Sequence, residues 1–318
     1  MDMASISKLI LRGFSISIFL ILLATIPYYV PEYYVSLLVS VYLYVILTVS
    51  WAMFSAPTGY MSLATATFFG IGIYTTAVLG ETMPLFIVIC LGGLFGFLIA
   101  LLVGLACMRL RGIYFAIFTF GLTELILHAL LFYELEVTGQ VGRLVVEMDA
   151  MIVYYAMLFI VVIVLLTVFI FKHSKYGLAL QGIGQAEVAA ACMGVNVNWI
   201  KIVVFAISAF FMGLAGAIMV TQWTYVDSRT AFNMFYSFMP ALMALFGGAR
   251  QIHGQILGAV VLTLLTETLL IKFPYYYMLL FGVLIVTIIL YSPSGVVGLF
   301  ESAKRRFRDV SGKTYGST

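Results

Sequence analysis

The sequence predicts an all-α protein, a polytopic bundle of about ten membrane-spanning helices. Of its 318 residues, 64% are hydrophobic and 9% are charged, against about 45–50% and about 25% in an average soluble domain. The charged residues gather in short clusters between apolar runs, and about 20 apolar residues suffice to cross a bilayer as a helix. Basic residues also favour every second connecting segment, as in multi-pass membrane proteins. Together these observations exclude a soluble globular protein.

Ten apolar segments are long enough to span and are bounded by Gly, Pro or charged residues. They are 12–30, 33–54, 59–80, 84–108, 112–133, 150–171, 202–223, 231–247, 255–271 and 275–291. The first could be a signal peptide, but its apolar run is long and no A-x-A cleavage site follows, so we interpret it as a span. The weakest are 59–80, rich in Gly, Thr and Ala, and 231–247, which is short. Each is either a complete span or a broken or re-entrant helix.

The positive-inside rule predicts that both termini are cytoplasmic. With that orientation, thirteen basic residues lie inside and three outside. The inside residues are Lys8, Arg12, Arg109, Arg111, Lys172, Lys175, Lys201, Arg250, Lys304, Arg305, Arg306, Arg308 and Lys313, and the outside residues are Arg143, Arg229 and Lys272. The protein is therefore expected in the cytoplasmic (inner) membrane, surrounded by lipid.

The whole chain, 1–318, is predicted to form a single transmembrane domain without a soluble domain. Its longest extramembrane segment is the cytoplasmic loop 172–200, and a basic tail occupies 300–318. Ten spans divide into five and five around the outer loop 134–149. An odd number in each half would invert the second half relative to the first, as in transporters whose solute path lies between the halves. Since the halves are only faintly similar in sequence, this inverted repeat is an arithmetical hypothesis.

The sequence lacks the patterns of common catalytic and metal sites. Its three histidines, His128, His173 and His253, are far apart, and its three cysteines show no paired spacing. The C-terminal sequence Ser311 to Thr314 resembles the end of a phosphate-binding loop, but Phe307 stands where that motif needs glycine. We therefore expect no catalytic residue, metal or cofactor. Any ATP-driven process would need a separate ATPase, and the net charge of +3 gives no reason to expect nucleic acid.

Two carboxylates, Glu124 and Glu267, fall within apolar segments. An ionisable group at membrane depth is costly and indicates an ion, proton or pathway site, although a hydrogen bond between helices is an alternative reading. His128 lies one turn after Glu124, so the two side chains could also satisfy each other. The small residues of 59–80, including Ser62 and Thr65, either line a pathway or permit tight helix packing. Ser62, Thr65 and Glu124 are our candidate pathway residues.

The loop 172–200 contains a segment of strong helix formers from Gln185 to Gly194, with Gly194 as the expected stop. Glu187, Ala190, Ala191 and Gly194 fall on one predicted helical face. Because this segment lacks the basic face and bulky apolar stripe of an interfacial helix, we expect a partner to dock on it. A bulky residue at Ala190 should then block docking. Any ion pair of Glu187 should be solvent-exposed and worth about 0–1 kcal/mol.

The run from Gly177 to Asn196 resembles the cytoplasmic signature loop of permease subunits in branched-chain amino-acid ABC importers. Other stretches resemble the same family in order along the chain: 59–63, 68–74, 109–117, 213–217, the glycine pairs around 247–259, and 292–299. The loop departs from that family at Gly182, Gly184 and Gln185, where charged or less flexible residues are common. These departures bear on the rigidity of the docking helix and on which ATPase fits it.

The resemblance implies a permease working by alternating access, with two ABC ATPases docking on Gln185, Glu187, Ala190, Ala191 and Gly194. It also implies a second, related permease forming a heterodimer and an extracytoplasmic solute-binding protein. Branched-chain or other hydrophobic amino acids are the expected substrates, and urea, amides and organic acids are carried by similar permeases. An ion-coupled secondary transporter using Glu124 is the alternative function. A membrane enzyme is a further alternative, but it would need the acidic or histidine clusters that the sequence lacks.

Overall fold

A computed structural model describes residues 22–276, 279–280, 282–283 and 286, and within them the chain is almost entirely helical. The elements before the long loop are η1 (Ile26–Tyr28), α2 (Glu32–Thr58), α3 (Thr65–Leu79), α4 (Leu85–Cys107), α5 (Ile113–Tyr133), η2 (Glu134–Thr138), β1 (Arg143–Leu144) and α6 (Ala150–His173). The later elements are α7 (Lys175–Gln185), α8 (Glu187–Cys192), α9 (Val197–Met219), η3 (Val220–Gln222), β2 (Tyr225–Val226), α10 (Ser228–Ala231), α11 (Phe235–Gly247) and α12 (Ile252–Lys272). The predicted all-α class is confirmed for these residues.

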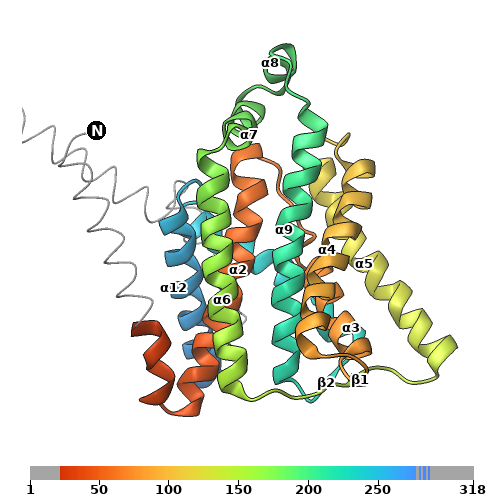
Figure 1. The fold of residues 1–318 in the computed structure, drawn as a ribbon, viewed down its shortest axis with the longest axis vertical. Coiled ribbons are helices and arrows are strands. Elements are labelled where there is room, and N and C mark those ends of the chain that lie inside the picture. Colours follow the sequence, from red (N-terminus) through yellow and green to blue (C-terminus); the bar gives the residue numbers. More distant parts are fainter. Residues whose placement is uncertain (1–21, 277–278, 281, 284–285, 287–318) are drawn as a thin grey trace, which may run out of the picture.

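Helix α9 is the centre of the bundle, packed against α2, α3 and α4 (Figure 1). Helix α2 also contacts α6, α11 and α12. Helix α5 lies at the periphery of the bundle. The short helices α7 and α8 cap one end of the bundle. At the opposite end, β1 and β2 pair antiparallel, with Arg143 opposite Val226, and join the α5–α6 connection to the α9–α10 connection.

Seven helical segments among the described residues are long and apolar enough to cross a membrane. They start at Glu32, Leu85, Ile113, Ala150, Val197, Ser228 and Ile252. Segment 59–80 contributes only the 15-residue helix α3, and 231–247 is interrupted between α10 and α11. Both weak segments are therefore broken rather than continuous helices. The predicted spans 12–30 and 275–291 lie mostly outside the described residues, so ten spans and an inverted repeat remain predictions.

The break before α3 is stabilised by side chains of neighbouring helices. Gly59 ends α2 with a left-handed φ of 73°, which glycine adopts readily, and residues 60–64 are not helical. The Trp51 indole N–H donates to the Ser62 carbonyl at 2.8 Å, and the Leu63 N–H donates to Thr119 Oγ1 at 3.0 Å. Such partners are required where backbone leaves the helix within a membrane protein.

Glycines let α3, α4 and α9 pack backbone against backbone. A Cβ atom on Gly213 would lie 2.6 Å from the Gly92 carbonyl oxygen, and one on Gly72 would overlap the Gly213 carbonyl. On α9, Gly216 meets the Phe69 carbonyl in the same way. These contacts favour tight packing as the role of the glycines in 59–80 and in 213–217.

The long loop folds into two helices rather than the one that the sequence predicts. Gln185 ends α7 instead of beginning a helix, and α8 starts at Glu187 after the extended residue Ala186. Gly194 follows the end of α8 with a φ of 84°, in agreement with its predicted role as a stop. Ser174 caps the start of α7 and Asn196 caps the start of α9, by accepting hydrogen bonds from Gly177 N and Trp199 N, respectively.

Candidate coupling site and translocation segment

The main polar cluster at the α7–α8 end is built around an ion pair between the loop and the bundle. Lys201 lies in the first turns of α9 and its side chain is 0% exposed. Its ammonium lies 2.9 Å from Glu187 Oε1, at the start of α8. A buried ammonium is tolerated only when it is paired, so this contact fixes α8 on the end of α9.

Tyr60 joins the ion pair to the non-helical segment 60–64. Its hydroxyl donates to Glu187 Oε2 at 3.0 Å, and the Lys201 ammonium lies 3.4 Å from the same hydroxyl and 4.6 Å from the centre of the ring. Arg111, in the α4–α5 connection, approaches Glu187 Oε2 at 3.9 Å. One carboxylate therefore links the loop to α9, to the α4–α5 connection and to the segment preceding α3.

The cluster favours the ionised form of Glu187. Partial burial by itself would raise the pKa of this carboxyl, but hydrogen bonds from Lys201 and Tyr60 and the charges of Lys201 and Arg111 together lower the pKa below its usual value. The sequence-based expectation of a solvent-exposed ion pair at Glu187 fits the contact with Arg111, whose side chain is 71% exposed, but is wrong for the closer partner Lys201, which is fully buried.

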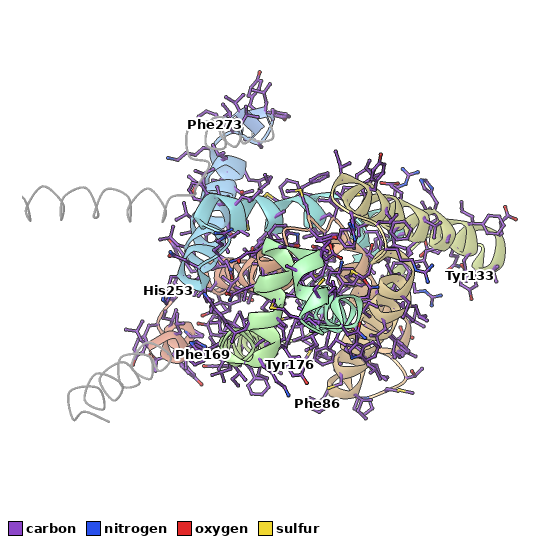
Figure 2. The ribbon with its side chains drawn as sticks, turned by 90° about the horizontal axis from the view of Figure 1, so that it is seen from above. Phe86, Tyr133, Phe169, Tyr176, His253 and Phe273 are labelled. Atoms are coloured by element: carbon purple, nitrogen blue, oxygen red, sulfur yellow. The ribbon has the colours of Figure 1, made fainter. Side chains whose placement is uncertain are left out.

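The structure also shows which side of α8 faces outward. Ala190 is 2% exposed and packs against the bundle on the same side as Glu187, whereas Ala191 and Gly194 are exposed. The outward side of the loop carries Tyr176, Leu178, Val188 and Met193, all more than half exposed; Figure 2 labels Tyr176 in this region. Gln185 is exposed and borders a cavity of about 340 Å³ between α2, α6, α7 and α12.

The candidate pathway residues Ser62 and Thr65 both lie at the break before α3. Each is at most 6% exposed. Ser62 Oγ accepts from Ala64 N at 3.4 Å, whereas Thr65 Oγ1 has no hydrogen-bond partner among the described residues. A buried hydroxyl without a partner is uncommon and needs an explanation such as water or a ligand.

A second carboxylate holds the other end of the 59–80 segment. Tyr74, in the second half of α3, donates a hydrogen bond to Glu134, and Ser228 Oγ donates to Glu134 Oε2 at 2.6 Å. The sequence places Glu134 in the outer loop, but the side chain is buried. Segment 59–80 is therefore tied by Tyr60 to Glu187 at one end and by Tyr74 to Glu134 at the other.

Glu124 lies apart from both clusters, on the peripheral helix α5. Its carboxylate is 3.5 Å from His128 Nε2, one turn later, so the predicted proximity of these residues is confirmed. The structure does not bring Glu124 together with Ser62 or Thr65 in a contact between described residues.

Sequence reasoning missed Tyr60 and Lys201 as members of the cluster. The sequence does single out Lys201, because it is the only charged residue within α9, a helix of 23 residues that is otherwise largely apolar. A lone charge in such a helix indicates a buried partner. Tyr60 carried no such signal, because a tyrosine at a span end is usually an interfacial anchor.

Comparison with known proteins agrees with this architecture. Residues 33–289 match the family described as "Branched-chain amino acid transport system / permease component". The high-affinity branched-chain amino acid transport system permease LivM of Escherichia coli K12 is 27% identical over 87% of this chain and 73% of its own length. LivM of Salmonella typhimurium is 27% identical over 85% of this chain and 71% of its own length. The ribose import permease RbsC of Haemophilus influenzae matches over only 38% of this chain and 39% of its own length. No solved structure matches.

The family match covers most of the chain, including the broken segment, the anchored loop and the glycine contacts of α9. It also agrees with the resemblance carried by the loop sequence. Such permeases are non-catalytic subunits of ABC transporters. The chain therefore belongs to the permease family of branched-chain amino acid transport systems.

Proposed function

We propose that this chain is a permease subunit of an importer for branched-chain or other small hydrophobic amino acids, working by alternating access. Urea, amides and short organic acids are the alternative substrates. The observation that carries the proposal is the ordered loop α7–α8, which is held to the bundle by a buried ion pair in a chain of this permease family. Membership of an ABC permease family argues against the ion-coupled alternative that would use Glu124.

The outward side of α7 and α8 is the proposed contact for an ABC ATPase subunit, two of which serve the heterodimer. Val188 and Met193 present apolar surface away from the bundle, and Ala191 and Gly194 lie beside them. Ala190 and Glu187 support this surface from behind, because both face the bundle. The segment proposed from the sequence, 185–194, is kept as the docking segment. Within it, the ATPase contact is proposed on the side of α8 opposite Glu187 and Ala190.

Docking is proposed to act through Glu187 on the break before α3, residues 60–65. A force on α8 reaches Tyr60 through one hydrogen bond, and Tyr60 begins the non-helical stretch that contains Ser62 and leads to Thr65. The unpaired Thr65 hydroxyl supports a place for Ser62 and Thr65 in the pathway. The solute-binding protein would deliver solute at the β1–β2 end, with both termini and α7–α8 on the cytoplasmic side of the inner membrane.

Uptake of labelled leucine into proteoliposomes containing the purified complex tests the function. We expect accumulation that requires ATP and the binding protein and that continues when a protonophore abolishes the proton gradient. Uptake without ATP that collapses with the protonophore would instead support the ion-coupled transporter.

The Tyr60→Phe variant tests the role of the loop in the same assay. It keeps the Glu187–Lys201 pair but removes the hydroxyl that joins them to segment 60–64. ATPase retention should be unchanged, while leucine transported per ATP hydrolysed should fall several-fold. Tyr42→Phe is the matched control, because it removes a buried tyrosine hydroxyl that bonds Tyr154 at 2.9 Å. Equal transport ratios in the two variants would contradict the proposed link.

A further inference from the structure

Helix α5 is the least buried of the long helices in the part of the chain that the structure describes. Its buried residues are Phe115, Thr119 and Thr123, one per turn along a single narrow stripe. Leu122, Ile126, Leu127 and Leu130 flank this stripe, half-buried against the core, and the opposite side of the helix faces away from the bundle. In Figure 2, Tyr133 marks the end of α5 at the lateral edge of the molecule.

The exposed side of α5 carries an ionisable pair. The Glu124 side chain is 40% exposed and that of His128 is 72% exposed. Among the described residues, no hydrogen bond or ion pair from another helix reaches either one. A contact with another helix of this chain therefore does not explain Glu124. The pair lies near the middle of a candidate span, where lipid chains offer no hydrogen-bond partners.

Helix α4 differs from α5, because much of its exposed surface is apolar and suited to contact with lipid chains. Leu94, Leu98, Leu102 and Leu105 form much of that surface. A lipid contact explains this apolar side without further assumption. It does not explain an exposed carboxylate beside an exposed imidazole on α5.

We propose that the exposed face of α5 is the surface on which the second permease subunit packs, so that Glu124 and His128 lie between the two subunits. This α5 face consists of Ile117, Gly121, Glu124, Leu125, His128 and Phe132, which share one side of the helix at spacings of three and four residues. Gly121 has open space where a Cβ would stand, which allows a neighbouring helix to approach closely. The inference rests on the proposed function, since it places the partner permease.

The chemistry of the face favours a related permease over a second copy of this chain. Two copies inserted in the same direction are related by an axis along the membrane normal. Packing through the α5 face would then set Glu124 opposite its counterpart and His128 opposite its counterpart, so that like groups face each other across the axis. A related permease with a hydrogen-bonding or basic side chain at this depth avoids that conflict and can pair with Glu124.

Photocrosslinking in native membranes tests the position of the partner. A benzoylphenylalanine residue is placed at Leu125 on the α5 face, or at Leu102 on α4 as the control. We expect the Leu125 probe to give an adduct whose peptides identify a distinct chain of the same permease family, joined within one of its membrane helices. The Leu102 probe should give lipid adducts only. Lipid adducts alone from Leu125, or a crosslink between two copies of this chain, would overturn the inference.

A double variant, Glu124→Leu with His128→Leu, gives a second measurement. If the α5 face touches lipid, replacing both polar groups with leucine should leave assembly and uptake unchanged, which would refute the proposal. If the face packs on a permease, recovery of that subunit with the tagged chain should fall at least several-fold at equal insertion. Wild-type uptake is measured in the same membranes. ATP-independent uptake there would refute the proposed function, whereas ATP-dependent uptake with an unaffected double variant would refute only the interface.

Discussion

Removing the carboxylate of Glu187 should destabilise the α7–α8 loop far more than the loss of a surface ion pair would. In Glu187→Gln, the Lys201 ammonium remains 0% exposed and loses the carboxylate charge that pairs with it, so it keeps neutral partners: the glutamine carbonyl oxygen, the Tyr60 hydroxyl at 3.4 Å and the Tyr60 ring. Leaving one partner of a buried pair uncompensated costs about 3–5 kcal/mol. Because the Glu187 side chain is itself 23% exposed, we take the lower end, about 3 kcal/mol.

The same geometry predicts an asymmetry between the two partners. In Lys201→Met, Glu187 keeps access to water and to Arg111 at 3.9 Å, so the cost should be smaller than in Glu187→Gln. The double variant, Glu187→Gln with Lys201→Met, leaves no buried charge and should recover most of the stability, because replacing both members of a buried pair is often nearly neutral.

Hydrogen exchange measured by mass spectrometry on peptides covering 175–195 provides the assay. A cost of about 3 kcal/mol corresponds to roughly a hundredfold increase in the open population of the loop. We expect exchange in Glu187→Gln to accelerate by about that factor, with smaller changes in the other two variants. An acceleration below about threefold, or a larger effect in Lys201→Met, would refute the assignment of Lys201 as a buried charge held by Glu187.

Three further predictions follow from particular residues. The pKa of Glu187 is lowered in the folded chain, so the stability that this carboxylate contributes is complete above its ordinary pKa of 4.5 and is lost as pH falls through the lower folded value. Hydrogen exchange of the loop, corrected for the pH dependence of the intrinsic exchange rate, should therefore rise in acid in the wild type. It should stay flat in Glu187→Gln. Gly213→Val should lower the free energy of unfolding of the purified permease by about 3 kcal/mol, because its Cβ would lie 2.6 Å from the Gly92 carbonyl oxygen; the half-buried Gly182, which has open space where a Cβ would stand, is the control for the same substitution. Ser174→Cys should react with an impermeant thiol reagent only after cells are opened, and labelling of intact cells would reverse the orientation.

The sequence alone was sufficient for the fold class, for the broad family and for the location of the helices, because long apolar runs and clustered charges are local properties of the chain. It also located the two weak spans and the glycine stop at Gly194. It failed on the helix start in the loop, since Gln185 and Glu187 are both good helix formers and Ala186 is extended only in the folded loop. The total of ten spans remains a prediction from apolar length.

Only the tertiary structure decided which face of α8 is buried and what Glu187 does. The i, i+3, i+4 pattern identifies a face but not its direction, because Ala190 and Ala191 are equally small and apolar. The partners of Glu187 come from residues up to 127 positions away in the sequence. Their meeting depends on how α9, the α4–α5 connection and the break before α3 converge at one end of the bundle. The same holds for Glu124, since the sequence places it at membrane depth, and only packing shows that its helix turns it away from the rest of the chain.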